Sequence, residues 1–109
     1  MPLPNFLIIG AAKAGTSWIA RRLGQHPQVY EAGSTYFFDN PVHFAKGIAW
    51  YERCFRGAKG ALAIGEKTPS YLWGAKYDSS SDPSIVPQRV RQVIPNARII
   101  VIVRNPANR

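Results

Sequence analysis

The chain has 109 residues, which is enough for one domain at most. Hydrophobic residues make up 46% and charged residues 18%, a balance that excludes an intrinsically disordered chain. The net charge of +8 suits an anionic partner, such as a nucleic acid, a membrane surface or a phosphorylated or sulfated small molecule. Charge alone does not choose among these partners, and a basic surface without any specific ligand stays open.

The sequence contains no obvious targeting or membrane-spanning segment. No apolar run reaches the ~20 residues of a membrane span, and no signal peptide is visible. The single cysteine, Cys54, excludes an internal disulfide and fits a reducing compartment. Cys54 lies in a predicted helix, and we interpret it as a packing residue. We therefore expect a cytoplasmic protein.

In chain order, the predicted elements alternate between strands and helices. Residues 5–9 predict a buried strand, and residues 16–23 a helix with Trp18, Ile19 and Leu23 at helical spacing. A short strand is expected at 28–31, an aromatic loop at 33–39, a helix around 48–55 and a strand at 61–65. Residues 84–94 suit a helix, and 98–103 form a β-branched run typical of a strand covered on both faces.

This alternation predicts an α/β fold of three layers, with a central parallel sheet between helices. Ligands of such sheets bind beyond the carboxyl ends of the strands. Lys13, the Glu66–Lys67 pair and Arg104 each follow a predicted strand directly, so we expect them at one edge of the sheet. The chain stops just after its most apolar strand. We therefore expect residues 1–109 to be the N-terminal part of a single longer domain.

The first strand and the first helix are joined by Gly-Ala-Ala-Lys-Ala-Gly-Thr-Ser at residues 10–17. In such a loop, backbone N–H groups and the positive end of the helix dipole face one point and bind an anion. The nucleoside-triphosphatase pattern has Lys directly before Ser/Thr, whereas here Thr16 takes that place and Lys13 lies three positions earlier. A cation inside the loop suits a short anionic tail that has no γ-phosphate and no obligatory metal.

Five segments resemble motifs of sulfotransferases that use PAPS (3′-phosphoadenosine 5′-phosphosulfate), in particular the heparan sulfate and related carbohydrate branch. They are Lys-Ala-Gly-Thr-Ser at 13–17, Tyr-Phe-Phe-Asp at 36–39, Gly-Ile-Ala-Trp-Tyr at 47–51, Glu-Lys-Thr-Pro-Ser-Tyr at 66–71 and Ile-Val-Ile-Val-Arg-Asn-Pro at 100–106. Their order and spacing agree over essentially the whole chain. The resemblance implies a P-loop-like sulfotransferase fold and transfer of a sulfuryl group from PAPS to a hydroxyl of a carbohydrate or similar acceptor.

The resemblance also implies roles for the matching residues. Lys13 would contact the bridging and sulfuryl oxygens and stabilise the charge that develops on the leaving phosphate. Lys67 would face the acceptor, and Arg104 would hold the 3′-phosphate with its guanidinium group. The implied donor-binding residues are Lys13, Ala14, Gly15, Thr16, Ser17 and Arg104. Thr16 and Ser17 could instead serve only as helix caps.

The general base is where the sequence departs from this family. Heparan-type enzymes place a Glu shortly before the two phenylalanines, and Ser34 stands at that position here. Serine is not a strong base, so Glu66 or Glu31 could replace it, or the base could lie outside this chain. The catalytic candidates are therefore Lys13, Lys67 and Glu66.

Several alternatives stay open. Tyr36, Phe37 and Phe38 could line the acceptor or adenine side or pack in the core, and His26 and His43 are interpreted as structural or solvated. No His/Cys spacing suits a metal, so we expect none.

A nucleotide- or nucleic-acid-binding module would use the basic charge, but Lys and Arg are dispersed, so we expect no nucleic acid partner. The third alternative is a kinase-like phosphotransferase, but the Lys that such enzymes have directly before Ser/Thr is missing here. The isolated chain could also be inactive.

Overall fold

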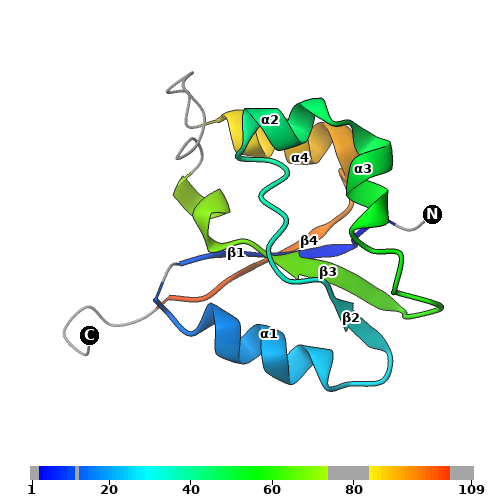
Figure 1. Ribbon diagram of the computed structural model, residues 1–109. Helices are drawn as coiled ribbons and strands as arrows, with labels where there is room; N and C mark the ends of the chain where they lie inside the picture. The colour runs from blue at the N-terminus through cyan, green and yellow to red at the C-terminus, as the bar shows by residue number, and fades with distance from the viewer. Residues whose placement is uncertain (1–2, 12, 74–83, 104–109) are drawn as a thin grey trace.

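The computed structural model describes residues 3–11, 13–73 and 84–103. Four strands form one parallel sheet in the order β2-β3-β1-β4 (Figure 1). The strands are β1 (Phe6–Gly10), β2 (Val29–Glu31), β3 (Ala63–Lys67) and β4 (Arg98–Val101). The helices are α1 (Thr16–Gly24), α2 (Pro41–Ala45), α3 (Ile48–Arg53) and α4 (Ile85–Val93), and a short 3-10 helix, η1 (Pro69–Trp73), follows β3.

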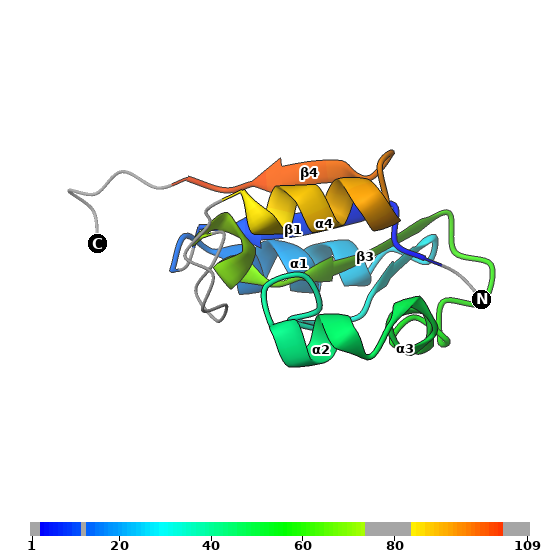
Figure 2. The ribbon, with the colours of Figure 1, turned by 90° about the horizontal axis from the view of Figure 1, so that it is seen from above.

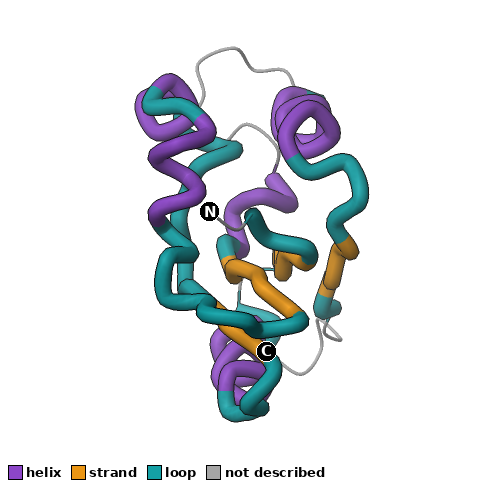
Figure 3. Tube along the Cα trace, turned by 90° about the vertical axis from the view of Figure 1, so that its right-hand side faces the viewer, coloured by secondary structure: helices purple, strands orange, loops and turns teal. Residues whose placement is uncertain are grey.

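The sheet lies between two layers of helices. Helix α1 covers one face, and α2, α3 and α4 cover the other, as the views from above and from the side both show (Figures 2 and 3). The predicted three-layer α/β/α arrangement is therefore confirmed. Parallel strands require crossover connections, and α1 supplies the one between β1 and β2. The carboxyl ends of the strands meet at the edge where α1 begins, on the left of Figure 1.

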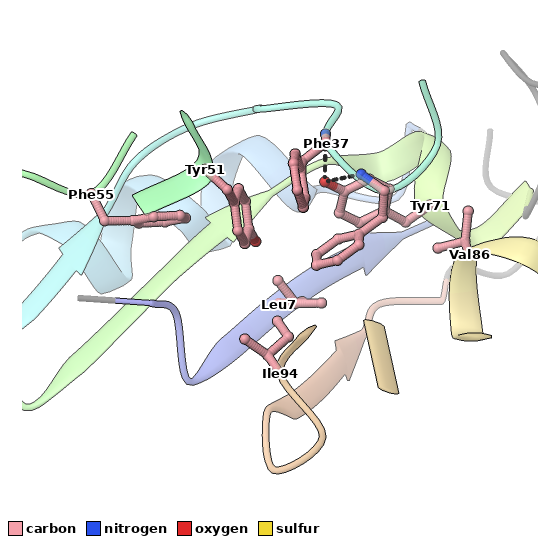
Figure 4. Packing of buried hydrophobic residues seen from close by; sticks show 8 residues of the cluster. Leu7, Phe37, Tyr51, Phe55, Tyr71, Val86 and Ile94 are labelled. Carbon is pink, nitrogen blue, oxygen red and sulfur yellow. Dashed lines mark hydrogen bonds between the residues drawn. The ribbon is translucent and has the colours of Figure 1, made fainter. Parts of the chain in front are cut away.

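An apolar cluster on each face of the sheet holds the layers together. The larger cluster consists of Leu7, Phe37, Phe38, Tyr51, Phe55, Tyr71, Val86 and Ile94 (Figure 4). In it the rings of Phe37 and Tyr51 stack with their centroids 4.2 Å apart. The smaller cluster contains Phe6, Ile8 and Ala20. Phe6 and Ile8 thus face α1 while Leu7 faces the other helices, as the alternation of side chains along a strand requires.

Two predictions about apolar residues are wrong. Trp18 does not pack on the sheet: it is 62% exposed, and the buried residues of α1 are Thr16 and Ala20. The last strand is not covered on both faces by the described residues either, since Ile99 and Val101 of β4 are 48% and 45% exposed. Both errors arise because the apolar pattern of a segment does not reveal which neighbours it will meet.

Two local features also differ from the prediction. Strand β3 begins and ends two residues later than expected, because it pairs with β1 as far as Ile8 opposite Lys67. Glu66 and Lys67 are therefore part of the strand. The stretch around His43 is a helix, α2, in which the Asn40 side chain accepts a hydrogen bond from Val42 N at 2.9 Å. Asn followed by Pro is a favourable start for a helix.

None of the helices within the described ranges combines the length and the apolar character needed to cross a membrane.

Candidate functional site

The loop between β1 and α1 turns through two residues with left-handed backbones. Lys13 has φ 63° and Gly15 has φ 95°. Glycine adopts this conformation freely, whereas for a residue with a Cβ it costs roughly 1–2 kcal/mol. Strain of this kind gathers at functional sites, and here it falls on the one lysine of the loop.

The loop, the first turn of α1 and the start of η1 surround an open cavity of about 390 Å³. Its lining residues are Lys13, Gly15, Thr16, Ser17 and Pro69. The first N–H groups of a helix have no partners within the helix, and they carry its partial positive charge. Together with the exposed Lys13, this end of α1 makes the cavity suitable for an anion.

Helix η1 packs directly against the beginning of the loop. A Cβ built on Gly10 would lie 2.8 Å from Leu72 Cβ and 3.2 Å from the Pro69 carbonyl oxygen. A side chain at position 10 would therefore collide with η1, the element that contributes Pro69 to the cavity wall.

Hydrogen bonds fix the base of the loop. Ala11 N donates to Ile102 O at 2.8 Å, and Ile102 N donates to Gly10 O at 2.7 Å. Ala14 N donates to Ala11 O at 3.2 Å. Of the predicted donor-binding residues, Ala14 thus has its amide engaged inside the loop, and it does not line the cavity.

Lys67, at the end of β3, contacts the first turn of α1 through Ser17 and so lies at the same edge of the sheet as Lys13. Lys67 Nζ donates to Ser17 Oγ at 3.1 Å, and Ser17 lines the cavity together with Lys13. The N-cap of α1 is Gly15, without a side-chain cap hydrogen bond, so the structure does not use Thr16 or Ser17 as caps. Arg104, the third predicted cation, lies outside the described residues.

Glu66 points to the opposite side of β3 from Lys67, because successive side chains of a strand alternate. It is 0% exposed and does not line the cavity. Burial raises the pKa of its carboxyl group, and hydrogen bonds from Thr68, Tyr51 and Thr35 oppose this shift. Its catalytic role stays a prediction, and a carboxylate without solvent contact is poorly placed to take a proton from an acceptor in the cavity.

The other two residues considered for the base also have local partners. The Glu31 carboxylate accepts a hydrogen bond from the Gly33 amide. Ser34 Oγ donates to the Lys67 carbonyl oxygen at 2.5 Å. Neither residue lines the cavity beside Lys13.

The aromatic segment after β2 is only partly buried. Phe37 and Phe38 are buried in the larger apolar cluster, whereas Tyr36 is 36% exposed. His43 Nδ1 lies 3.1 Å from the carbonyl oxygens of Thr35 and Tyr36, so this histidine has a structural contact.

The remaining polar residues singled out by the sequence have local contacts. His26 accepts a hydrogen bond from Gln28 N at 3.0 Å. Cys54 packs against the larger apolar cluster, and burial raises the pKa of its thiol. Among the described residues, no group of three or more His, Cys, Asp or Glu side chains could hold a metal ion.

Trp18 is a surface residue, although the sequence analysis grouped it with the apolar residues of the first helix. It directly follows Ser17 in the first turn of α1 and is largely exposed. The guanidinium carbon of Arg22 lies 5.7 Å from the centroid of its ring. In the sequence, the place of Trp18 directly after the loop could have indicated an exposed side chain, because residues in the first turn of such a helix can face outward as well as the core.

Comparison with known proteins agrees with the fold and with the family resemblance found in the sequence. Residues 3–109 match the family described as a sulfotransferase domain. Mouse heparan sulfate glucosamine 3-O-sulfotransferase 5 is 32% identical over 98% of this chain and 29% of its own length. Human bifunctional heparan sulfate N-deacetylase/N-sulfotransferase 2 is 35% identical over 98% of this chain and 12% of its own. The crystal structure of a sulfotransferase from Alicyclobacillus acidocaldarius superposes with a TM-score of 0.75 and 31% identity, covering 99% of this chain and 47% of that one.

The chain thus spans less than a third of these curated relatives and about half of the solved structure. Another relative, the membrane-associated sulfotransferase kil1 of Dictyostelium discoideum, is 31% identical over 98% of this chain and 21% of its own length. The expectation of a cytoplasmic protein is therefore wrong, because this relative, which matches nearly the whole chain, is named as membrane-associated. The lack of an apolar span in this sequence does not reveal the compartment. The family match, the relatives and the superposition agree that this chain belongs to the sulfotransferase family.

Proposed function

We propose that the protein containing this chain transfers a sulfuryl group from PAPS to a hydroxyl group of a carbohydrate. The observation that carries the proposal is Lys13, held in a left-handed turn at the wall of a cavity that the positive end of α1 also faces. The phosphosulfate of PAPS is a short anionic tail, and it suits a loop with a cation inside it rather than after it.

In the reaction, the acceptor oxygen forms a bond to the sulfur of PAPS. The bond between that sulfur and the bridging oxygen of the 5′-phosphate breaks, and 3′-phosphoadenosine 5′-phosphate (PAP) leaves with the bonding electron pair. The acceptor hydroxyl loses its proton to a base. Neither Glu31 nor Glu66 lines the cavity, so we do not propose either of them as that base.

Two lysines would stabilise the negative charge that the reaction redistributes. Charge builds on the 5′-phosphate oxygen as the bond breaks, and a fixed cation at Lys13 would stabilise it in the transition state more than in the ground state. The ammonium of Lys67, held at 3.1 Å from Ser17, would approach the sulfuryl oxygens from the β3 side. We propose that Gly15, Thr16 and Ser17 bind the 5′-phosphate and Arg104 the 3′-phosphate.

Trp18 supports a donor that carries a nucleobase. Trp18 exposes its ring in the first turn of α1, directly after the loop proposed to bind the 5′-phosphate, and we propose that the base of the donor stacks on it. Aromatic rings bind bases by stacking, with little dependence on the identity of the base. Tyr36, also exposed, is not part of this proposal.

The carbohydrate acceptor is supported by the relatives. Two of the proteins that match the chain over 98% of its length act on heparan sulfate, according to their names. The net charge of +8 is compatible with an acidic polysaccharide, although it would also suit the donor alone.

Calorimetry on the full-length protein tests the donor assignment. PAP should bind without a divalent metal and more tightly than ATP with Mg²⁺, and Lys13→Ala should weaken PAP binding. The matched control is Lys59→Ala, because Lys59 is also exposed and also has a positive φ, 24°, but lies in the turn before β3. Equal PAP affinity in wild type and Lys13→Ala, or a preference for ATP with Mg²⁺, would refute the proposal.

We further propose that the 109-residue chain by itself is inactive. The chain exposes the apolar residues Ile99 and Val101 of β4, and Val103, two positions after β4, is 81% exposed. It also covers only 47% of the solved relative. Tight PAP binding by the isolated chain would contradict this proposal without affecting the one for the full-length protein.

A further inference from the structure

Glu66 is surrounded by hydrogen-bond donors that belong to three separate segments. Its carboxylate accepts from the amide of Thr35 at 3.3 Å and from the hydroxyl of Thr35 at 2.8 Å. It also accepts from the hydroxyls of Tyr51 and Thr68, each at 2.5 Å, and from that of Tyr71 at 3.1 Å. Thr35 lies in the loop after β2, Tyr51 in α3, and the other two residues follow β3. One side chain therefore joins three parts of the chain.

The hydroxyl of Tyr71 extends this network into the loop backbone (Figure 4). It accepts from Phe37 N at 3.0 Å and from Phe38 N at 3.3 Å, so its own hydrogen is directed toward Glu66. The hydroxyl of Thr35 also accepts from Phe37 N, at 3.2 Å. Buried amides without partners are costly. The conformation of the loop therefore depends on Glu66.

The direction of these hydrogen bonds suits a carboxylate. Each partner named above donates to Glu66, and a glutamine at this position would turn an NH₂ group toward at least one of these donors. The hydrogen-bond partners of Glu66 among the described residues are all neutral groups. The buried carboxylate therefore has no positively charged partner among them to offset its loss of water. Burying a charge in this way is expensive, and an apolar side chain would pack more favourably. The arrangement is therefore better explained by the geometry it imposes than by stability.

A strained residue in the same loop supports this explanation. The backbone of Tyr36 lies in the left-handed region, with φ 54°, which is unfavourable for a tyrosine. Its neighbours are held on both sides: Thr35 N is bonded to Glu66, and Phe37 N is bonded to the Thr35 hydroxyl. The ring of His43 lies 3.1 Å from the Thr35 and Tyr36 carbonyl oxygens. These contacts keep the loop in a conformation it would not otherwise adopt.

The same loop holds the backbone of Lys67. Lys67 N donates to Gly33 O at 3.1 Å, and Lys67 O accepts from Ser34 Oγ at 2.5 Å. On the other face of β3, the ammonium of Lys67 reaches Ser17. A shift of the loop would therefore move Lys67 relative to the cavity even though Glu66 itself never contacts the cavity.

We propose that Glu66 is a positioning residue for sulfuryl transfer. From the buried face of β3 it sets the loop at residues 33–38 and the backbone of Lys67, and it acts on the reaction only through them. This inference rests on the proposed function, because it assigns Lys67 to the reacting group. It gives Glu66 a role different from accepting the acceptor's proton.

The test compares Glu66→Gln with Ile94→Ala in the full-length protein. Ile94 belongs to the same apolar cluster, so its truncation weakens the core without removing a hydrogen bond of the network. We expect Glu66→Gln to lower kcat per PAP-binding site by about 100-fold, the size of effect that follows from misplacing a group by about 1 Å. The Kd for PAP should not change. Ile94→Ala should lower the Tm but leave kcat per site as in the wild type.

A second measurement separates this inference from the proposed function. Amide hydrogen exchange at residues 33–38 and at Lys67 should be faster in Glu66→Gln than in wild type, and unaltered at these positions in Ile94→Ala. If the protein transfers no sulfuryl group from PAPS, the proposed function fails, while faster exchange would still support the positioning of the loop and Lys67 by Glu66.

A folded Glu66→Gln protein with wild-type kcat, or with wild-type exchange in this loop, would overturn the inference. If Glu66→Gln does not fold, Tyr71→Phe replaces it in both measurements. That change keeps the ring in the core and removes only the hydroxyl that links Glu66 to the amides of Phe37 and Phe38. Unchanged kcat and exchange in Tyr71→Phe would have the same meaning.

Discussion

The ammonium group of Lys67 donates a hydrogen bond to the hydroxyl of Ser17, with 3.1 Å between Nζ and Oγ, and so joins the end of β3 to the first turn of α1. Ser17 also shares the wall of the cavity with Lys13. This short side chain thus contacts one of the two cations proposed for sulfuryl transfer and lies beside the other. Their joint action depends on a pairing between segments that are 50 residues apart.

Replacing Ser17 by Ala should reduce kcat/KM for PAPS. The change removes the hydroxyl that holds the Lys67 ammonium, and a hydrogen bond of this kind contributes about 1 kcal/mol, which corresponds to roughly a fivefold effect. Steady-state kinetics of the full-length enzyme measures it. Ser17→Thr keeps a hydroxyl and should retain most of the activity. An unchanged kcat/KM in Ser17→Ala would mean that Lys67 does not depend on this contact.

Trp18→Ala should weaken the binding of PAP. Stacking of a base on an aromatic ring contributes about 1–3 kcal/mol, so we expect the Kd to rise by roughly an order of magnitude or more. Trp18→Phe should keep most of the affinity. Leu62→Ala serves as the control, because Leu62 is a similarly exposed apolar side chain, at 74%, but lies just before β3. Equal losses in Trp18→Ala and Leu62→Ala would argue against stacking.

Gly10→Ala should destabilise the fold and impair PAP binding together. The new Cβ would lie 2.8 Å from Leu72 Cβ, and overpacking of this kind costs about 1–3 kcal/mol. Thermal unfolding and calorimetry measure the two effects. Gly60→Ala is the matched control, since Gly10 and Gly60 both have a positive φ, 154° and 81°, but a Cβ on Gly60 meets no atom within 4 Å. Gly60→Ala should therefore be destabilised by backbone strain alone and bind PAP normally.

The pH dependence of stability should carry a contribution from Glu66. Burial raises its pKa in the folded state above the ordinary value of 4.5, so the native state binds the proton more tightly than the unfolded state. The stabilisation linked to this proton is fully present below pH 4.5 and is lost as the pH rises through the elevated pKa. Denaturant titration measures the free energy of unfolding of both proteins. The difference between wild type and Glu66→Gln should therefore fall as the pH rises from 4.5. A difference that rises over this range would contradict the direction of the pKa shift.

Much of the fold could be predicted from the sequence because its signals are local. The apolar run of β1, the small residues after it and the helix that starts at Thr16 are adjacent in the chain, so their order alone indicates a strand, an anion-binding loop and a helix. The spacing of motifs such as Glu66-Lys67-Thr68-Pro69 indicated the family in the same way, and the family match over residues 3–109 agrees.

The roles of individual side chains were less predictable, because they depend on which face of an element meets which neighbour. Glu66 and Lys67 are adjacent in sequence, yet one is sealed in the core and the other reaches Ser17, since β3 continues two residues further than expected and its side chains alternate. The pattern of α1 likewise does not reveal that Trp18 faces outward.

By itself, then, the sequence determined the succession of strands and helices, the loop with Lys13 inside it and the kinship with sulfotransferases, because each of these is encoded in neighbouring residues. Only the tertiary structure decided that β4 pairs beside β1, that Lys67 meets Ser17 and that Glu66 lies among Thr35, Tyr51 and Tyr71. Those outcomes follow from the order and register of the parallel strands, which bring distant segments together and are set by packing of the whole sheet rather than by any one segment.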